Sequence, residues 1–203
     1  MSSDPFSFYP YSSYLFIILA YLIGSIPVGV ILGKAKGTDP RTIGSGNIGA
    51  TNVMRAAGKM TGMLTLVGDV LKGLIPVVLV AHAGEPRIIV VVAGLAAFLG
   101  HLFPIFLRFR GGKGVATALG VYIALDPFAI IIAAIVFVAV LVKWQYVSLG
   151  SLVGVAAMPV LLYLLNGPAE YIYLSLIMGT LIFVKHRENI GRLLAGTENK
   201  ITG

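Results

Sequence analysis

The sequence predicts an all-α integral membrane protein with about seven transmembrane helices, some of them short or broken. Of its 203 residues, 58% are hydrophobic and only 11% carry a charge, whereas about 25% of the residues of a soluble domain are charged. Several apolar stretches also approach the roughly 20 residues that a helix needs to cross a bilayer. No linker or shift of composition divides the chain, so we expect residues 1–203 to form a single domain.

Each predicted span is an apolar stretch bounded by polar or turn-forming residues. Segment 115–142 is too long for one crossing and contains Asp126-Pro127, where the proline disfavours continuation of a helix. We therefore expect a hairpin of two short helices there, which gives seven spans. A re-entrant segment or a single kinked helix would give six. The predicted spans cover residues 14–33, 60–80, 88–107, 115–124, 128–142, 146–165 and 171–184.

Lysine and arginine are distributed very unequally between the two sides that these spans define. One side receives only Arg87, and Lys72 falls inside a span. Because basic loops stay in the cytoplasm, we expect the N-terminus outside and the C-terminus in the cytoplasm. The opening residues MSSDPFSFYPYSS contain no Lys or Arg, so we expect no signal peptide and a first span that remains as a helix. The basic side receives Lys34, Lys36, Arg41, Arg55, Lys59, Arg108, Arg110, Lys113, Lys143, Lys185, Arg187, Arg192 and Lys200.

The composition also excludes several classes of site. The chain contains no cysteine, which excludes disulfides, cysteine-ligated metals and a thiol nucleophile. Its three histidines are scattered without metal-ligand spacing, so we expect neither a metal nor a cofactor. The net charge of +7 is typical of basic cytoplasmic loops in a membrane protein, and we expect no nucleic-acid partner.

The stretch GSGNIGATNVMR, residues 44–55, is the first candidate for chemistry on the cytoplasmic face. Its glycines let successive backbone N–H groups approach and surround an anion. Its serine, asparagine and threonine side chains add hydrogen bonds, and its arginine can clamp a phosphate. An ordinary flexible loop is the alternative interpretation. The candidate residues are Ser45, Gly46, Asn47, Gly49, Thr51, Asn52 and Arg55.

The stretch RFRGGKG, residues 108–114, is the second candidate. It directly precedes a predicted helix, and the N-terminal end of a helix favours an anion. It is not a Walker A loop, because Leu107 stands where the first glycine should be and Gly114 follows the lysine. A basic anchor for the helix ends is the alternative, and it suits Arg108 best. The phosphate-binding candidates are Arg110, Gly111, Gly112, Lys113 and Gly114.

The third candidate, GDVLKG at residues 68–73, lies inside a span, where charges are costly and usually functional. Asp69 and Lys72 are three residues apart and share a helix face. Either they form a structural ion pair, or Asp69 supports Lys72 as it reaches a phosphate. His101, near the inner end of its span, is expected to hydrogen-bond internally.

The fourth candidate, KHRENIGRLLAGTE at residues 185–198, begins where the last span meets the cytoplasm. On a continued helix His186, Asn189 and Ile190 lie on one side, and Glu188 is expected to support them structurally. A basic juxtamembrane anchor is the alternative. Together the four stretches predict a glycine-rich, cationic pocket of phosphate size on the cytoplasmic face.

Five ordered motifs in this chain resemble those of the bacterial acylphosphate-dependent glycerol-3-phosphate acyltransferases, the PlsY family. They are GSIPVG, GSGNIGATNVMR, DVLKG, GHLFPIFLRFRGGKGVAT and KHRENIGRLLAGTE, and they run from Gly24 to Glu198. Any one of them is weak evidence, but the ordered set is highly specific and covers nearly the whole chain.

The resemblance implies an enzyme that transfers a fatty acyl group from acyl-phosphate to glycerol 3-phosphate. The products are lysophosphatidic acid and inorganic phosphate, in the first acylation step of phospholipid biosynthesis. Ser45, His186 and Asn189 are then the catalytic residues, and the remaining candidates bind phosphate. The leaving phosphate is the expected proton acceptor, with His186 as the alternative base. The resemblance also implies a bacterial inner membrane and an active site facing the cytoplasm, and we expect a monomer.

A phosphate-ester transporter and a lipid-binding scaffold are the alternative functions. A transporter is expected to have repeated halves and polar residues near the middle of the membrane, whereas the polar residues here crowd one face. A scaffold explains the basic face through anionic lipids, but it does not explain the loop of glycine, serine and asparagine.

Overall fold

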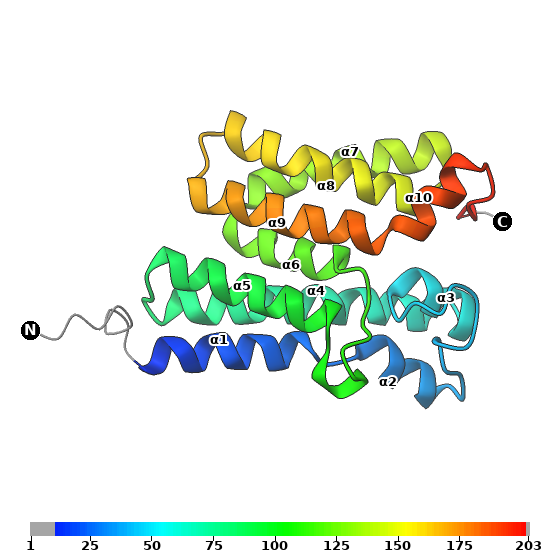
Figure 1. Ribbon diagram of the computed structural model, residues 1–203, viewed down its shortest axis with the longest axis horizontal. Helices are drawn as coiled ribbons and strands as arrows, with labels where there is room; N and C mark the ends of the chain where they lie inside the picture. Colours follow the sequence, from blue (N-terminus) through cyan, green and yellow to red (C-terminus); the bar gives the residue numbers. More distant parts are fainter. Residues whose placement is uncertain (1–10, 202–203) are drawn as a thin grey trace, which may run out of the picture.

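The computed structural model describes residues 11–201, which form helices and, within that range, no strand. The long helices lie side by side in a bundle, with several short helices gathered at one end (Figure 1). In chain order the elements are α1 (Tyr11–Gly24), α2 (Val28–Ala35), α3 (Ala50–Ala57), α4 (Lys59–His82), α5 (Arg87–Leu102), η1 (Ile105–Leu107), α6 (Val115–Leu125), α7 (Pro127–Trp144), α8 (Val147–Leu164), α9 (Ala169–Lys185) and α10 (Arg187–Leu194).

The predicted all-α membrane architecture is confirmed. Five segments of the described chain are long and apolar enough to cross a membrane: α1 with α2, α4, α5 with η1, α7 and α8. Two shorter elements, α6 with 11 residues and α9 with 17, complete the set of seven that the sequence predicts. The sidedness of the termini stays a prediction, and the opening residues 1–10 lie outside the described residues.

Two predicted spans are interrupted, and prolines explain both interruptions. The first predicted span, 14–33, breaks between α1 and α2 at Ser25-Ile26-Pro27, and the third, 88–107, ends as an α-helix at Leu102, two residues before Pro104. Proline has no N–H to donate and disfavours a helical conformation of the residue before it. Both segments remain long and apolar enough to cross a membrane, as predicted, but each contains a break that its residue range did not indicate. Each break frees backbone carbonyls beside the polar stretches.

The predicted hairpin within 115–142 is confirmed as α6 and α7, which contact each other. Asp126 occupies the N-cap position of α7, and its carboxylate accepts a hydrogen bond from the Ala129 N–H at 2.9 Å. Pro127 begins α7, where a missing N–H costs nothing because the first amides of a helix have no intrahelical partner. The same dipeptide therefore ends one helix and starts the next.

Close helix packing depends on glycine where α4 meets α6. A Cβ on Gly73 would lie 2.2 Å from the Thr117 carbonyl oxygen, and a Cβ on Gly120 would lie 2.0 Å from the Val70 carbonyl oxygen. Small residues of this kind let transmembrane helices approach each other closely. The rest of the bundle forms by contacts of α1 with α5, α7 with α8, and α8 with α9, while α9 also contacts α5 and α6.

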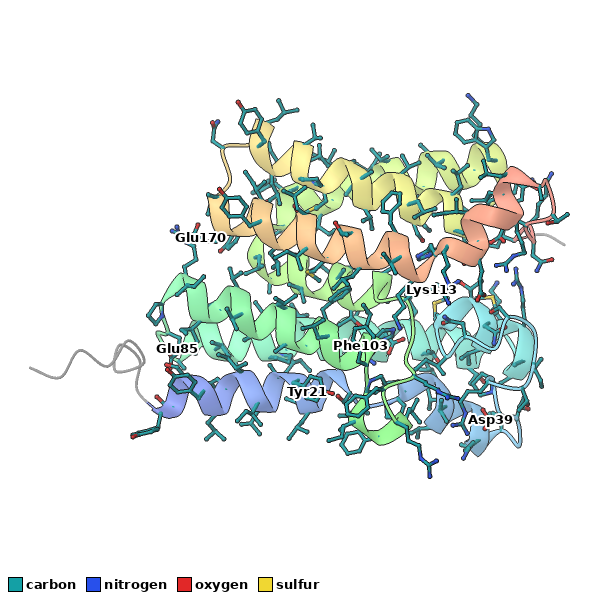
Figure 2. All side chains as sticks on the ribbon, in the orientation of Figure 1. Tyr21, Asp39, Glu85, Phe103, Lys113 and Glu170 are labelled. Carbon is teal, nitrogen blue, oxygen red and sulfur yellow. The ribbon has the colours of Figure 1, made fainter. Side chains whose placement is uncertain are left out.

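Three of the four polar stretches lie at one end of the bundle, with α2, α3, α10 and the loop before α6, and the stretch 68–73 lies within α4 (Figure 1). Glu85 and Glu170 lie at the opposite end (Figure 2).

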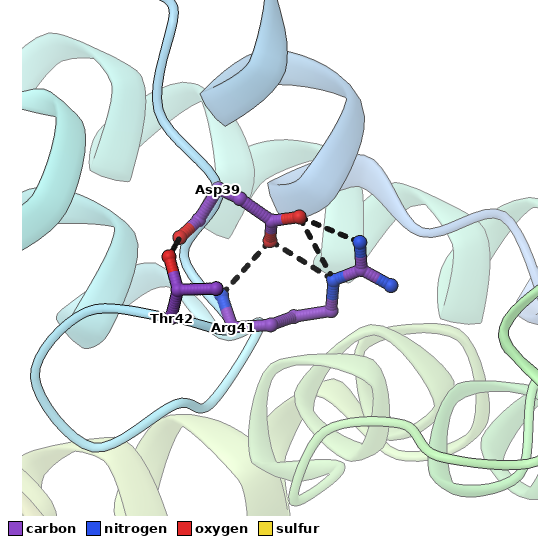
Figure 3. Close-up of polar contacts among 3 residues, drawn as sticks. All are labelled: Asp39, Arg41 and Thr42. Carbon is purple, nitrogen blue, oxygen red and sulfur yellow. Dashed lines mark hydrogen bonds and ion pairs between the residues drawn. The ribbon is translucent and has the colours of Figure 1, made fainter.

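A compact turn leads from α2 into the first stretch. Asp39 accepts hydrogen bonds from the backbone N–H and the guanidinium of Arg41, and the Thr42 hydroxyl donates to the Asp39 carbonyl (Figure 3). The hydrogen bonds from Arg41 hold the pKa of Asp39 well below its usual range.

Candidate active site

A cavity of about 580 Å³ lies at this polar end and continues between α6, α7, α8 and α9. Three of the four predicted polar stretches contribute much of its polar lining, and small and apolar side chains line its inner part. The structure therefore brings together residues that are far apart in the sequence. The predicted residues that line the cavity are Ser45, Asn47, Gly49, Thr51, Asn52, Arg55, Asp69, Lys113, Gly114, His186 and Asn189.

The N-terminus of α3 forms one wall of the polar end. Intrahelical bonding in α3 starts with the Asn52 and Val53 amides, both bonded to the Gly49 carbonyl, so the N–H groups of Ala50 and Thr51 have no carbonyl one turn earlier to bond. Both residues line the cavity. An anion placed there would meet free amide donors and the positive end of the helix dipole.

Asn52 holds the preceding loop in shape. Its buried side-chain amide donates to the carbonyls of Pro40, Ile43 and Asn47 at 2.8 to 3.0 Å, and its Oδ1 accepts from the Ser45 N–H at 2.9 Å. Each of these side-chain hydrogen bonds is thus directed at the loop. Its geometry fits a residue that orders the loop around a ligand, and its prediction as a phosphate ligand stays untested.

Arg55 and Thr51 lie four residues apart on α3, one turn along the same face. Arg55 is exposed, lines the cavity and forms no ion pair within the described residues. A guanidinium in that position can bond two oxygens of one phosphate. The α3 wall therefore offers amides, a hydroxyl and a cation to the same volume.

The glycines of RFRGGKG serve the packing of the loop on α5. The Gly111 N–H donates to the Leu102 carbonyl at 3.2 Å, and the Gly112 N–H donates to the His101 carbonyl at 3.1 Å. A Cβ on Gly112 would lie 2.1 Å from His101 Nε2. These two amides are therefore engaged within the protein, contrary to the expectation that they face an anion. Neither glycine lines the cavity.

Lys113 is the cation of this loop that lines the cavity (Figure 2). It is half-buried, and its Nζ donates to Asn189 Oδ1, which joins the loop before α6 to α10. Burial lowers the pKa of Lys113, and the positive charge of Arg192 lowers it further. Concentrating cations in one partly desolvated place is costly unless an anion binds between them.

Glu198 completes this network, although no role was predicted for it from the sequence. Its carboxylate accepts hydrogen bonds from Asn189 Nδ2 at 2.6 Å, Arg192 Nε at 2.6 Å and Ser148 Oγ at 2.7 Å. Burial acts to raise the pKa of Glu198, but these hydrogen bonds outweigh burial and hold it below the usual range of a glutamate. Glu198 thus aims the Asn189 side chain so that its oxygen receives the lysine.

Three residues of this hydrogen-bond network had no predicted role: Ser148, Arg192 and Glu198. Arg192 could have been found, because it follows Asn189 by three residues and lies on the same face of α10. Glu198 lies in the same motif but beyond the helix. Nothing in the local sequence singles out Ser148, which the packing of α8 brings to the site.

His186 stands at a bend between α9 and α10, so the continuous helix expected there was wrong. It is buried and lines the cavity, as Asn189 does, whereas Ile190 does not. Its Nδ1 lies 2.9 Å from the Ile182 carbonyl oxygen. Because a carbonyl only accepts, Nδ1 carries the hydrogen, and the neutral ring keeps Nε2 as an acceptor. Burial lowers the pKa of His186 to about 4, although the Ile182 carbonyl acts to raise it.

The protein is expected to lose stability as the pH falls from about 6.5 toward 4. In that window the unfolded chain binds a proton at His186 and the folded chain does not, so the unfolded state gains relative free energy. Thermal unfolding in detergent between pH 4 and 8 measures this shift, with a His186→Asn variant as the control. If His186→Asn lost as much stability between pH 6.5 and 4 as the parent protein does, the loss would not come from protonation of His186.

Asp69 and Lys72 form an ion pair inside α4, with Lys72 Nζ 2.9 Å from Asp69 Oδ1. Lys72 also donates at 2.9 Å to the Ile26 carbonyl, in the break between α1 and α2, which accepts from the Val28 N–H as well. Asp69 lines the cavity and Lys72 does not. His101 Nδ1 lies 3.6 Å from Asp69 Oδ1, so the internal hydrogen bond expected for His101 does not form there. The geometry favours the structural ion pair, and the binding of phosphate by Lys72 stays a prediction.

Three other predicted residues lie away from the cavity wall. Gly46 has a φ of +67° in the loop before α3, Arg110 is exposed beside η1, and Glu188 is exposed in the first turn of α10. A carboxylate at that position favours the start of a helix, which agrees with a supporting role for Glu188. The phosphate-binding roles of Gly46 and Arg110 stay predictions.

A family model described as glycerol-3-phosphate acyltransferase matches residues 14–196. The chain belongs to the glycerol-3-phosphate acyltransferase family. A member from Geotalea daltonii is 55% identical over 188 residues, which cover 93% of this chain and 97% of that protein. This glycerol-3-phosphate acyltransferase family member is also similar to solved structures of PlsY (YgiH), an integral membrane glycerol 3-phosphate acyltransferase.

The glycerol 3-phosphate form of PlsY superposes with a TM-score of 0.90 at 42% identity and covers 93% of this chain and 95% of the other. The lysophosphatidic acid form superposes with a TM-score of 0.88 at 41% identity, with the same shares covered. The fold of this acyltransferase family member thus has solved counterparts over nearly the whole chain.

Proposed function

We propose that the protein transfers a fatty acyl group from acyl-phosphate to glycerol 3-phosphate and releases lysophosphatidic acid and inorganic phosphate. One observation carries this proposal. A single cavity has a cationic, amide-rich end and an apolar interior between α6, α7, α8 and α9. A phosphate group fits the cationic end and an acyl chain fits the apolar interior. Acyl-phosphate and lysophosphatidic acid each contain a phosphate group and an acyl chain. Similar proteins that carry the name glycerol-3-phosphate acyltransferase support this assignment.

The polar end holds enough cations for two phosphate groups. The N-terminus of α3 with Ser45 and Arg55 binds one phosphate, and Lys113 with Arg192 binds the other across the cavity. Charge that develops on the leaving phosphate is stabilised by the same groups, which are already positioned by Asn52 and by Glu198. Asn189 links Lys113 to Glu198, because its side-chain oxygen accepts from the lysine and its side-chain nitrogen donates to the glutamate.

The reaction is one acyl substitution. A hydroxyl oxygen of glycerol 3-phosphate bonds to the acyl carbonyl carbon, the bond from that carbon to the phosphate oxygen breaks, and the phosphate leaves with the electron pair. The hydroxyl proton passes to the leaving phosphate, as the resemblance implies. His186 has an acceptor nitrogen in its neutral form and is the second candidate for that proton. In the preferred scheme His186 orients the hydroxyl.

The protein is further proposed to act as a monomer in a bacterial inner membrane, with the cavity facing the cytoplasm. The described basic residues support this orientation. Apart from Lys72 inside α4 and Arg87, which pairs with Glu170, they lie toward the end of the bundle that holds the cavity, whereas Glu85 and Glu170 lie at the other end (Figure 2). The positive-inside rule places the basic end in the cytoplasm.

Purified protein given palmitoyl-phosphate and glycerol 3-phosphate, without metal or nucleotide, is expected to release inorganic phosphate and form lysophosphatidic acid. Release should require both substrates, so each is omitted in turn as the control. Folded protein that releases no phosphate, and is also inactive with palmitoyl-CoA, would overturn the proposal. Uptake of labelled glycerol 3-phosphate into proteoliposomes would then favour the transporter.

A further inference from the structure

The apolar part of the cavity ends at a ring of four side chains, one from each surrounding helix. Counting from the polar end, the last lining residues are Tyr122 on α6, Ile130 on α7, Met158 on α8 and Ser175 on α9. One turn further along α8, Leu162 is fully buried in the core and does not line the cavity. The ring is therefore a floor with packed protein beneath it.

The polar atoms of this floor are directed at the backbone. Tyr122 is 3% exposed, and its hydroxyl donates to the Tyr171 carbonyl at 3.0 Å. The Ser175 hydroxyl donates to the Ile172 carbonyl at 2.7 Å. Because both hydroxyl hydrogens are already used, the floor offers the cavity mainly apolar surface and a fixed aromatic ring. Such a floor can limit a hydrocarbon chain by contact without hydrogen-bonding to it.

We propose that Tyr122 and Met158 set the longest acyl chain that the enzyme transfers efficiently. This inference rests on the proposed function, because it assumes that the acyl tail occupies the apolar part of the cavity. From Ser148 at the polar end to Met158 at the floor is ten residues of α8, which is about 15 Å of helix. A tail that reaches the floor cannot be extended without displacing packed side chains.

A glycine in the wall allows the cavity to be shortened as well as deepened. Gly179 lines the cavity one turn of α9 above Ser175. A Cβ placed there would meet only Val155 Cγ1, at 3.4 Å, which is an ordinary contact. The backbone therefore leaves room for a Cβ at this position, and the added methyl groups of a valine would fill space that the tail occupies.

The test compares initial rates with myristoyl-, palmitoyl- and stearoyl-phosphate at saturating glycerol 3-phosphate. Tyr122→Leu and Met158→Ala are expected to raise the ratio of the stearoyl rate to the myristoyl rate by about tenfold, and Gly179→Val is expected to lower it similarly. Met158→Ala leaves the Tyr122 hydrogen bond intact, so it tests the floor if Tyr122→Leu does not fold.

Two variants serve as controls. Tyr122→Phe keeps the aromatic floor and removes only the hydroxyl, so its profile should match the parent. Tyr173→Leu makes the same substitution as Tyr122→Leu, but at an exposed tyrosine of α9 that does not line the cavity. Its chain-length profile should also match the parent.

The outcomes separate the two proposals. Active variants whose chain-length profiles match the parent would show that the tail leaves the cavity above the floor, which overturns this inference and leaves the acyl transfer standing. A parent protein that acylates glycerol 3-phosphate with none of the three chains overturns the proposed function and the inference together. Opposite shifts for Met158→Ala and Gly179→Val support both.

Discussion

Replacing Lys113 with alanine is expected to lower kcat/KM for acyl transfer by about a hundred- to a thousandfold, the usual cost of removing one preorganised donor from a charge-stabilising site. Lys113 is half-buried, lines the cavity and is held by Asn189. The loss should fall on kcat as well as KM, because the charge of the leaving phosphate grows toward the transition state. Phosphate release at several substrate concentrations measures both constants.

Lys34→Ala is the matched control. Lys34 is an exposed lysine in the last turn of α2 and does not line the cavity. Both variants remove one positive charge from the same end of the bundle, so a general electrostatic effect on an acidic membrane surface would affect them equally. Equal activities for the two variants would contradict the assignment of Lys113 to the site.

Gly120→Ala is expected to destabilise the protein by about 3 kcal/mol or more, at or above the upper end of ordinary overpacking. The new Cβ would lie 2.0 Å from the Val70 carbonyl oxygen. A backbone oxygen inside α4 cannot move aside as a flexible side chain can, so α4 and α6 must separate. The midpoint of thermal unfolding in detergent measures the loss, and activity should fall with it because α6 lines the cavity.

Gly191→Ala makes the same chemical change in α10, where a Cβ would meet nothing within 4 Å. This variant is expected to be neutral or stabilised by up to about 1 kcal/mol, because alanine is the better helix former. A Gly120→Ala variant as stable as Gly191→Ala would show that α4 and α6 do not pack as closely as described.

Much of the helical architecture could be predicted from hydrophobicity alone, since a bilayer requires long apolar helices. Pro127 also marked a boundary correctly, because Asp126 beside it is a favourable N-cap. The breaks at Pro27 and Pro104 were missed because the surrounding residues remain apolar. Hydrophobicity averaged over the length of a span hides a local interruption of the helix. These breaks matter to the site. At the first, Lys72 donates to the Ile26 carbonyl, and the second lets the loop before α6 fold back onto α5.

The sequence by itself determined the class of the protein, the four polar stretches and the kinds of group they offer, because composition and residue type decide where a chain can meet lipid and where it can hold phosphate. Only the tertiary structure decided which residues share the cavity. It directed the Gly111 and Gly112 amides to α5, paired Lys72 with Asp69, and brought Glu198 to Asn189. These outcomes depend on contacts between residues distant in sequence, and no local pattern encodes the distance between two side chains that folding brings together.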